Sequence, residues 1–160
     1  MKTWIVLGMV GALAACSDSK KLSAGWVGTY DCSESAALTF TTPSDMPPTT
    51  TSASATWTIA SPSDGVLTAV VVSEGDAVAC LLQFANNGGA ATIADGQSCA
   101  ANGLALAYDG GTLHYVVYSM SANLPFAFDG TMTVAGDAGP GQTVHVTGTG
   151  TATTTCTERK

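Results

Sequence analysis

The sequence predicts an all-β protein, either a single antiparallel up-and-down β-barrel or a β-sandwich, with about eight to ten short strands. Short runs rich in β-branched and aromatic residues alternate between apolar and polar positions, and no run keeps the apolar stripe of a helix. Turn signals separate these runs, among them Asp64-Gly65, Asp95-Gly96 and Asp109-Gly110. The chain is long enough for one domain with a real core.

The first runs lie at residues 25–32, 37–40 and 55–60. In the run at 25–32, strand alternation places Trp26, Tyr30 and Cys32 on one face. Residues 41–55 are rich in proline, threonine and serine, and this composition predicts a surface loop.

The later strands are predicted from seven further runs: 66–72, 77–84, 90–94, 104–108, 112–118, 125–134 and 142–156. In the last run the residues that share the inner face are Val144, Val146, Gly148, Gly150, Ala152 and Cys156. Glycine on an inner face indicates a bend or the close approach of another element.

The start of the chain has the layout of a signal peptide. Lys2 supplies a positive charge, an apolar run follows from Trp4 to Leu13, and two alanines precede Cys16. The apolar run is well short of the roughly 20 residues that a transmembrane helix needs. We expect a signal helix outside the fold.

Leu13-Ala14-Ala15-Cys16 resembles the bacterial lipobox. The resemblance implies cleavage before Cys16, diacylglycerol on its thiol, and anchoring in the membrane of the cell envelope by the acyl chains. Ser17, at the position where an aspartate favours inner-membrane retention, favours the outer membrane. The domain organisation that we expect is a signal peptide at 1–15, a lipidated tether at 16–24 and an all-β domain at 25–160.

Four cysteines remain beyond Cys16, and an even number in an exported chain predicts disulfides. Four thiols allow three pairings, which sequence alone cannot separate. We expect Cys32–Cys156, which would join the first strand to the last, and Cys80–Cys99. No C-x-x-C spacing suggests zinc, and we expect no metal site.

Composition excludes several function classes. The formal net charge is −7 with five Lys and Arg residues, so nucleic-acid binding has no electrostatic basis. The sequence contains no nucleophile elbow, P-loop or zinc-protease motif, and we expect neither an enzyme nor a cofactor. His145 alternates with valines and is expected to face solvent, while His114 has no placed carboxylate partner.

The aromatic residues are the remaining candidates for a binding site. They can fill a core or line a ligand pocket, and the pocket that we consider consists of Trp26, Tyr30, Trp57, Tyr108 and Tyr115. Core packing is the simpler interpretation of the same residues.

Residues 80–99, CLLQFANNGGAATIADGQSC, together with the Thr- and Gly-rich run that ends at Cys156, resemble small disulfide-containing Gram-negative envelope lipoproteins. This resemblance implies no activity. The opening AGWVGTY is similar to the start of lipocalin-like barrels, although the order of its Gly and Trp differs.

Three functions follow as expectations. The first is a lipid-anchored envelope lipoprotein of structural or interaction type, whose partners are the membrane and an envelope protein or glycan. The second is a lipocalin-like carrier of a small apolar ligand. The third is a periplasmic protease inhibitor that uses residues 17–24 as its arm. A cavity inside the barrel would favour the carrier over a packed scaffold.

Overall fold

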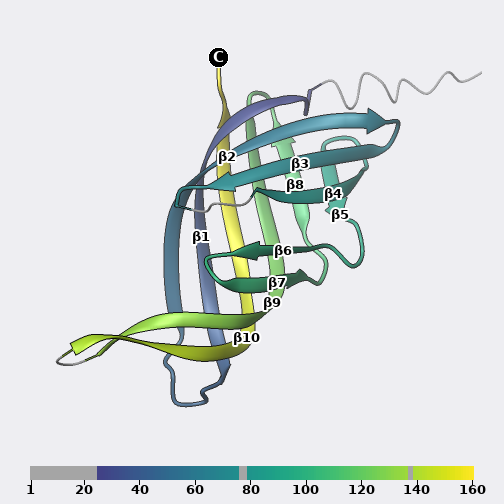
Figure 1. Cartoon of the computed structure of the whole chain (residues 1–160). Coiled ribbons are helices and arrows are strands. Elements are labelled where there is room, and N and C mark those ends of the chain that lie inside the picture. The colour runs from purple at the N-terminus through teal and green to yellow at the C-terminus, as the bar shows by residue number, and fades with distance from the viewer. Residues whose placement is uncertain (1–24, 76–78, 137–138) are drawn as a thin grey trace, which may run out of the picture.

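The computed structural model describes residues 25–75, 79–136 and 139–160, and every regular element in these ranges is a β-strand (Figure 1). No helix in the described part is long and apolar enough to cross a bilayer. The expected signal helix, Cys16 and the tether lie outside the described residues. The strands are β1 (Gly28–Thr42), β2 (Thr49–Ser63), β3 (Val66–Ser73), β4 (Cys80–Asn86), β5 (Ala90–Ile93), β6 (Ser98–Ala101), β7 (Leu104–Tyr108), β8 (Thr112–Val116), β9 (Ser119–Gly136) and β10 (Gly139–Glu158).

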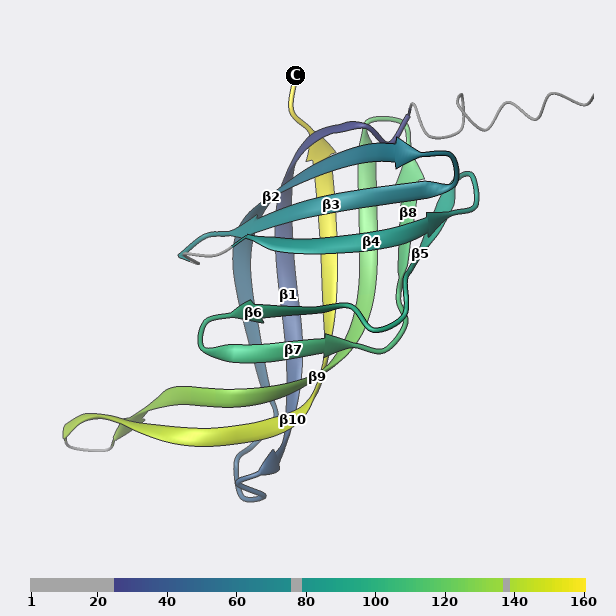
Figure 2. The ribbon, with the colours of Figure 1, turned by 45° about the vertical axis from the view of Figure 1, so that its right-hand side comes forward.

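The strands form one antiparallel sheet that closes on itself. The hydrogen-bonded order is β10-β1-β2-β3-β4-β5-β8-β9, and pairing of β9 with β10 closes this ring of eight strands. The hairpin of β6 and β7 joins the ring through β9, and Figure 2 shows it between β4 and the β9–β10 ribbon. The predicted all-β, antiparallel, barrel-like fold is confirmed.

Strand β9 changes its neighbour along its length. Residues Ser119–Asn123 pair with β8, whereas Phe126–Gly130 pair with β7. Pro125 falls at the change, so its missing N–H interrupts neither of these two ladders. We call the part of the barrel that contains β3, β4, β5 and β8 the closed half, and the part that contains β6 and β7 the open half.

The open half has a gap in its hydrogen bonding. Among the described residues, β6 has a ladder with β7 alone, and residues 49–54 of β2 have a ladder with β1 alone, because β3 begins to pair at Ala55. Two strand edges therefore flank the open half, one from β6 and one from β2.

The prediction of a loop over residues 41–55 is wrong for most of that stretch. β1 continues to Thr42, and β2 begins at Thr49 and pairs with β1 from there. Threonine has a high strand propensity, and the composition is polar because residues 49–54 are exposed. The expectation of short strands is also wrong for β9 and β10, which have 18 and 20 residues.

Alternation of buried and exposed side chains along the strands produces two apolar clusters. The cluster of the closed half includes Trp26, Tyr30, Trp57, Leu82 and Phe84. The cluster of the open half consists of Leu38, Phe40, Leu104, Phe126, Phe128 and Val146. The inner faces predicted for the first and last strands are confirmed.

The inner-face glycines of β10 lie beneath aromatic rings, as predicted. Gly148 and Gly150 are the ladder partners of Phe128 and Phe126. A Cβ on Gly150 would lie 2.6 Å from Cζ of Phe126 and 2.9 Å from the carbonyl oxygen of Ala37. The two rings therefore use space that only glycine leaves open.

Both expected disulfides are present. Cys32 and Cys156 are direct partners in the β1–β10 ladder, with Cα atoms 4.0 Å apart. Cys80 and Cys99 join β4 to β6, which share no ladder in the described residues, with Cα atoms 5.4 Å apart. The first bridge reinforces a hydrogen-bonded seam, and the second spans the gap in the open half.

Candidate functional site

A cavity of about 370 Å³ lies inside the barrel between the two apolar clusters. Its volume falls within the range of roughly 300–1,000 Å³ that is typical of small-molecule sites. The wall is mostly apolar and includes Leu38, Trp57, Leu104, Tyr108, Phe126 and Ala152. The interior is therefore hollow where the two halves of the barrel meet.

The cavity reaches solvent through the gap of the open half. Its outer lining includes the exposed residues Ser52 and Ala53 of β2, Glu74 after β3, and Asn102 in the β6–β7 turn. These residues come from the two strand edges described above, together with the end of β3. A small molecule has an entry path there that does not require strands to separate.

One carboxylate projects into this apolar interior. Glu34 follows Cys32 by two residues on β1, so it shares the inward face. Trp57 Nε1 donates a hydrogen bond of 2.8 Å to its Oε1, and Ser73 Oγ donates one of 3.1 Å to its Oε2. Each oxygen retains a second lone pair that a ligand in the cavity can use.

Two further polar groups stand near Glu34 on the cavity wall. Thr154 is its ladder partner on β10 and is 2% exposed, and its hydroxyl has no hydrogen-bond partner among the described residues. Burial, with a smaller contribution from the charge of Glu34, raises the pKa of Tyr108 to about 12. The Tyr108 hydroxyl therefore stays protonated at neutral pH and can donate a hydrogen bond.

The structure divides the aromatic residues of the predicted pocket between two places. Trp57 and Tyr108 line the cavity. Trp26, Tyr30 and Tyr115 pack together in the closed half, where the rings of Trp26 and Tyr115 have centroids 5.4 Å apart. The hydroxyl of Tyr30 donates a 3.0 Å hydrogen bond to the carbonyl of Trp26, and burial raises the pKa of Tyr30 to about 12.

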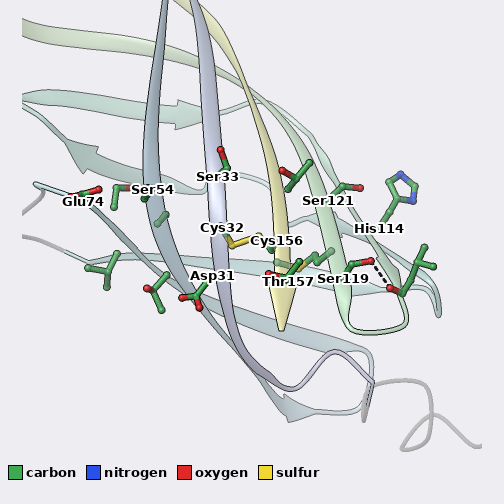
Figure 3. Close-up of a pocket in the computed structure, with 17 residues that line it drawn as sticks. Asp31, Cys32, Ser33, Ser54, Glu74, His114, Ser119, Ser121, Cys156 and Thr157 are labelled. Atoms are coloured by element: carbon green, nitrogen blue, oxygen red, sulfur yellow. Dashed lines mark hydrogen bonds between the residues drawn. A yellow bond between two sulfur atoms is a disulfide. The ribbon is translucent and has the colours of Figure 1, made fainter. Parts of the chain in front are cut away.

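A second hollow, of about 970 Å³, lies on the outer face of the barrel (Figure 3). Outward-facing residues of β1, β2, β3, β8, β9 and β10 line it, and the labelled side chains are mostly serines and acidic residues. The Cys32–Cys156 bridge lies beneath its centre, and His114 stands at one side. Its lining consists largely of exposed short polar side chains, which offer a small ligand little apolar surface.

The histidines form no catalytic arrangement with the described residues around them. His145 faces solvent, as predicted, and its Nε2 lies 3.0 Å from Oδ1 of Asp129, with both side chains more than half exposed. His114 is exposed on β8. Within residues 25–75, 79–136 and 139–160, no group of three His, Cys, Asp or Glu residues is placed to hold a metal ion.

Sequence reasoning did not single out Glu34 and Thr154. Their signal was their position in the strand, because Glu34 has the same parity as Cys32 and Leu38, and Thr154 the same parity as Cys156. An acidic residue at an inward position of a predicted strand is the kind of buried polar residue that marks a site.

Comparisons with known proteins add little to this description. No family model matches the chain, and no curated protein matches it. The crystal structure of Rv2717c from M. tuberculosis aligns over 90% of this chain and 99% of that one, with a TM-score of 0.38 and 10% sequence identity.

Proposed function

We propose that the chain is a lipid-anchored protein of the cell envelope whose barrel binds a small ligand. The ligand has an apolar body and one hydrogen-bond-donating or positively charged group. The observation that carries this proposal is the cavity of about 370 Å³ between the two clusters, with the Glu34 carboxylate in its wall. A packed interior would instead have favoured a purely structural lipoprotein.

The polarity of the wall selects the ligand class. The apolar body would contact Leu38, Leu104 and Phe126, and its polar group would meet Glu34. A carboxylate accepts hydrogen bonds and attracts cations, so an amine or hydroxyl suits it and an acid does not. Burying a charge beside Glu34 without a partner is costly, which makes discrimination against anions strong.

The envelope location rests on separate features. The lipobox at Leu13–Cys16 supports a lipid anchor, and the two disulfides are typical of an oxidising compartment. Cys16 takes part in neither bridge, which leaves its thiol for lipid attachment. An outer-membrane location and an envelope protein or glycan partner stay predictions, and the hollow of Figure 3 is the surface that such a partner would use.

Filling the cavity should abolish binding without unfolding the barrel. The neutral probe N-phenyl-1-naphthylamine has two aromatic rings and one N–H donor, and its fluorescence rises in apolar surroundings. We expect the purified chain to bind it and Ala152→Leu, whose side chain enters the cavity, to weaken binding at least tenfold. Thr153→Leu is the matched control, because Thr153 is exposed on the outer face of the same strand. Equal binding by both variants would contradict the proposal.

The role of Glu34 is tested by competition against the same probe. Octylamine and octanoate have the same chain length and opposite charge at neutral pH. Because hydrogen bonds to charged groups contribute about 1.5–3 kcal/mol, octylamine should displace the probe at a concentration at least about tenfold lower than octanoate. Glu34→Gln should remove most of that preference. A preference for octanoate in the unaltered chain would overturn the ligand class, though not the cavity.

A further inference from the structure

We infer that the end of the barrel formed by the β8–β9 turn, the start of β1 and the last residues of β10 rests on an anionic phospholipid surface. This inference goes beyond ligand binding, although the lipid anchor proposed above is one of its supports. The partner is a bilayer, and the surface that meets it is the apolar tip, defined as Val27, Val116, Val117 and Tyr118.

The apolar tip is unusually exposed. Val116, Val117 and Tyr118 are 69%, 69% and 64% exposed, the highest values for large apolar side chains in the described residues. Val27, beside the start of β1, is 47% exposed. Valine and tyrosine side chains that water surrounds gain free energy on entering the headgroup region, where tyrosine is enriched.

The turn uses residues that do not suit its geometry. Val117 and Tyr118 alone connect β8 to β9, and two-residue hairpins normally use glycine, asparagine or aspartate. Tyr118 has a φ of 63°, a left-handed conformation that is uncommon for a bulky residue. Folding alone therefore does not account for these side chains, and a contact outside the barrel does.

Both ends of the described chain meet at this tip. A Cβ on Gly25 would lie 3.1 Å from the ring of Tyr115, which places the entry of the tether beside β8. The backbone N–H of Glu158 donates a 2.9 Å hydrogen bond to the carbonyl of Tyr118. Figures 1 and 2 both show the β8–β9 turn, the start of β1 and the C-terminal end together at the top of the barrel.

The length of the tether restricts how far this end can be from a membrane. The proposed lipid attachment at Cys16 precedes Gly25 by nine residues. A fully extended chain of that length spans at most about 30 Å. Whatever the conformation of the tether, the tip is the part of the barrel nearest to the anchor along the chain.

Positive charge is confined to the same end. Apart from Lys2 in the expected signal peptide, the Lys and Arg residues of the sequence are Lys20, Lys21, Arg159 and Lys160. Asp31 and Glu158 also lie at this end, and Asp31 is paired with Arg159. The chain between residues 32 and 157 has nine acidic residues and no Lys or Arg. An anionic surface therefore repels the rest of the barrel and attracts only this end.

The test measures how deeply two single tryptophan reporters enter lipid. Val117→Trp places the reporter on the tip, and Leu81→Trp is the matched control on β4, at an outward-facing position that is 56% exposed. The full chain, expressed with its own leader, is reconstituted into vesicles of phosphatidylglycerol and phosphatidylcholine that contain brominated acyl chains. The native Trp26 and Trp57 are buried, and the unaltered chain supplies their background.

We expect brominated lipid to quench the added emission of Val117→Trp at least threefold more than that of Leu81→Trp. Replacing Lys20, Lys21 and Lys160 with glutamine should lower this ratio to the value found in pure phosphatidylcholine. A ratio that is unchanged by these replacements would contradict the role of charge.

Failure of the inference is distinguishable from failure of the anchor. A chain that floats with the vesicles but shows equal quenching of the two reporters overturns the inference and leaves the anchor standing. A chain that does not float contradicts both. A blue shift of Val117→Trp emission without quenching, together with a doubled mass, would place a second copy of the chain on the tip and likewise overturn the inference.

Discussion

Replacing Cys32 and Cys156 together with alanine lowers the free energy of unfolding by about 5 kcal/mol, because their bridge closes a loop over a sequence separation of 124. The bridge removes many extended conformations from the unfolded chain, and it joins the first and last strands of the ring. A loss of this size is a large part of the 5–15 kcal/mol by which domains are stable. Guanidinium unfolding followed by tryptophan fluorescence measures it.

The second bridge provides the matched comparison. Cys80→Ala with Cys99→Ala opens a separation of only 19, and the same argument gives a loss of about 3 kcal/mol. This pair spans the gap beside the cavity, so its removal should weaken probe binding more than removal of the Cys32–Cys156 bridge does. If the Cys80–Cys99 pair proved the more stabilising of the two, the loop argument would be contradicted.

Replacing Cys16 with alanine should abolish membrane attachment completely. In lipoproteins of the type that the lipobox indicates, the thiol carries the diacylglycerol, and without acyl chains nothing equivalent holds the domain on a bilayer. Cells fed labelled palmitate should incorporate label into the unaltered chain and none into Cys16→Ala. Fractionation should then find the variant in the soluble fraction of the envelope.

Folding does not confound this experiment, because Cys16 belongs to neither disulfide. Ser17→Ala is the matched control and should keep both label and attachment. Ser17→Asp should keep the label but shift the chain toward the inner membrane. Label on Cys16→Ala, or none on the unaltered chain, would contradict the lipid anchor while leaving the cavity argument untouched.

The sequence was most informative about faces and least informative about position along the barrel axis. Alternation placed Trp26, Tyr30 and Trp57 on inner faces correctly, because one burial side per strand is a local property. Whether an inner residue meets the cavity or the packed cluster depends on its height in the barrel. Register between distant strands sets that height, and Trp57 lines the cavity while Tyr30 does not.

The gap of the open half could not have been predicted from local pattern. It exists because β9 exchanges β8 for β7 near Pro125 and because β2 outruns β3, and both are consequences of strand lengths. The Thr- and Ser-rich start of β2 conceals its strand character, since its exposure requires polar residues on both faces. The disulfide pairing was predictable because one bridge had to join the first and last strands, which close the ring.

The most direct test of the central claim is native mass spectrometry of the protein extracted gently from its own cells. The account predicts a bound molecule of a few hundred daltons on the unaltered chain, which leaves on collisional activation and carries an amine or hydroxyl. Ala152→Leu should lose this adduct, and Thr153→Leu should keep it. The bare mass in every preparation, together with no binding of N-phenyl-1-naphthylamine, would contradict the claim that the barrel carries a ligand.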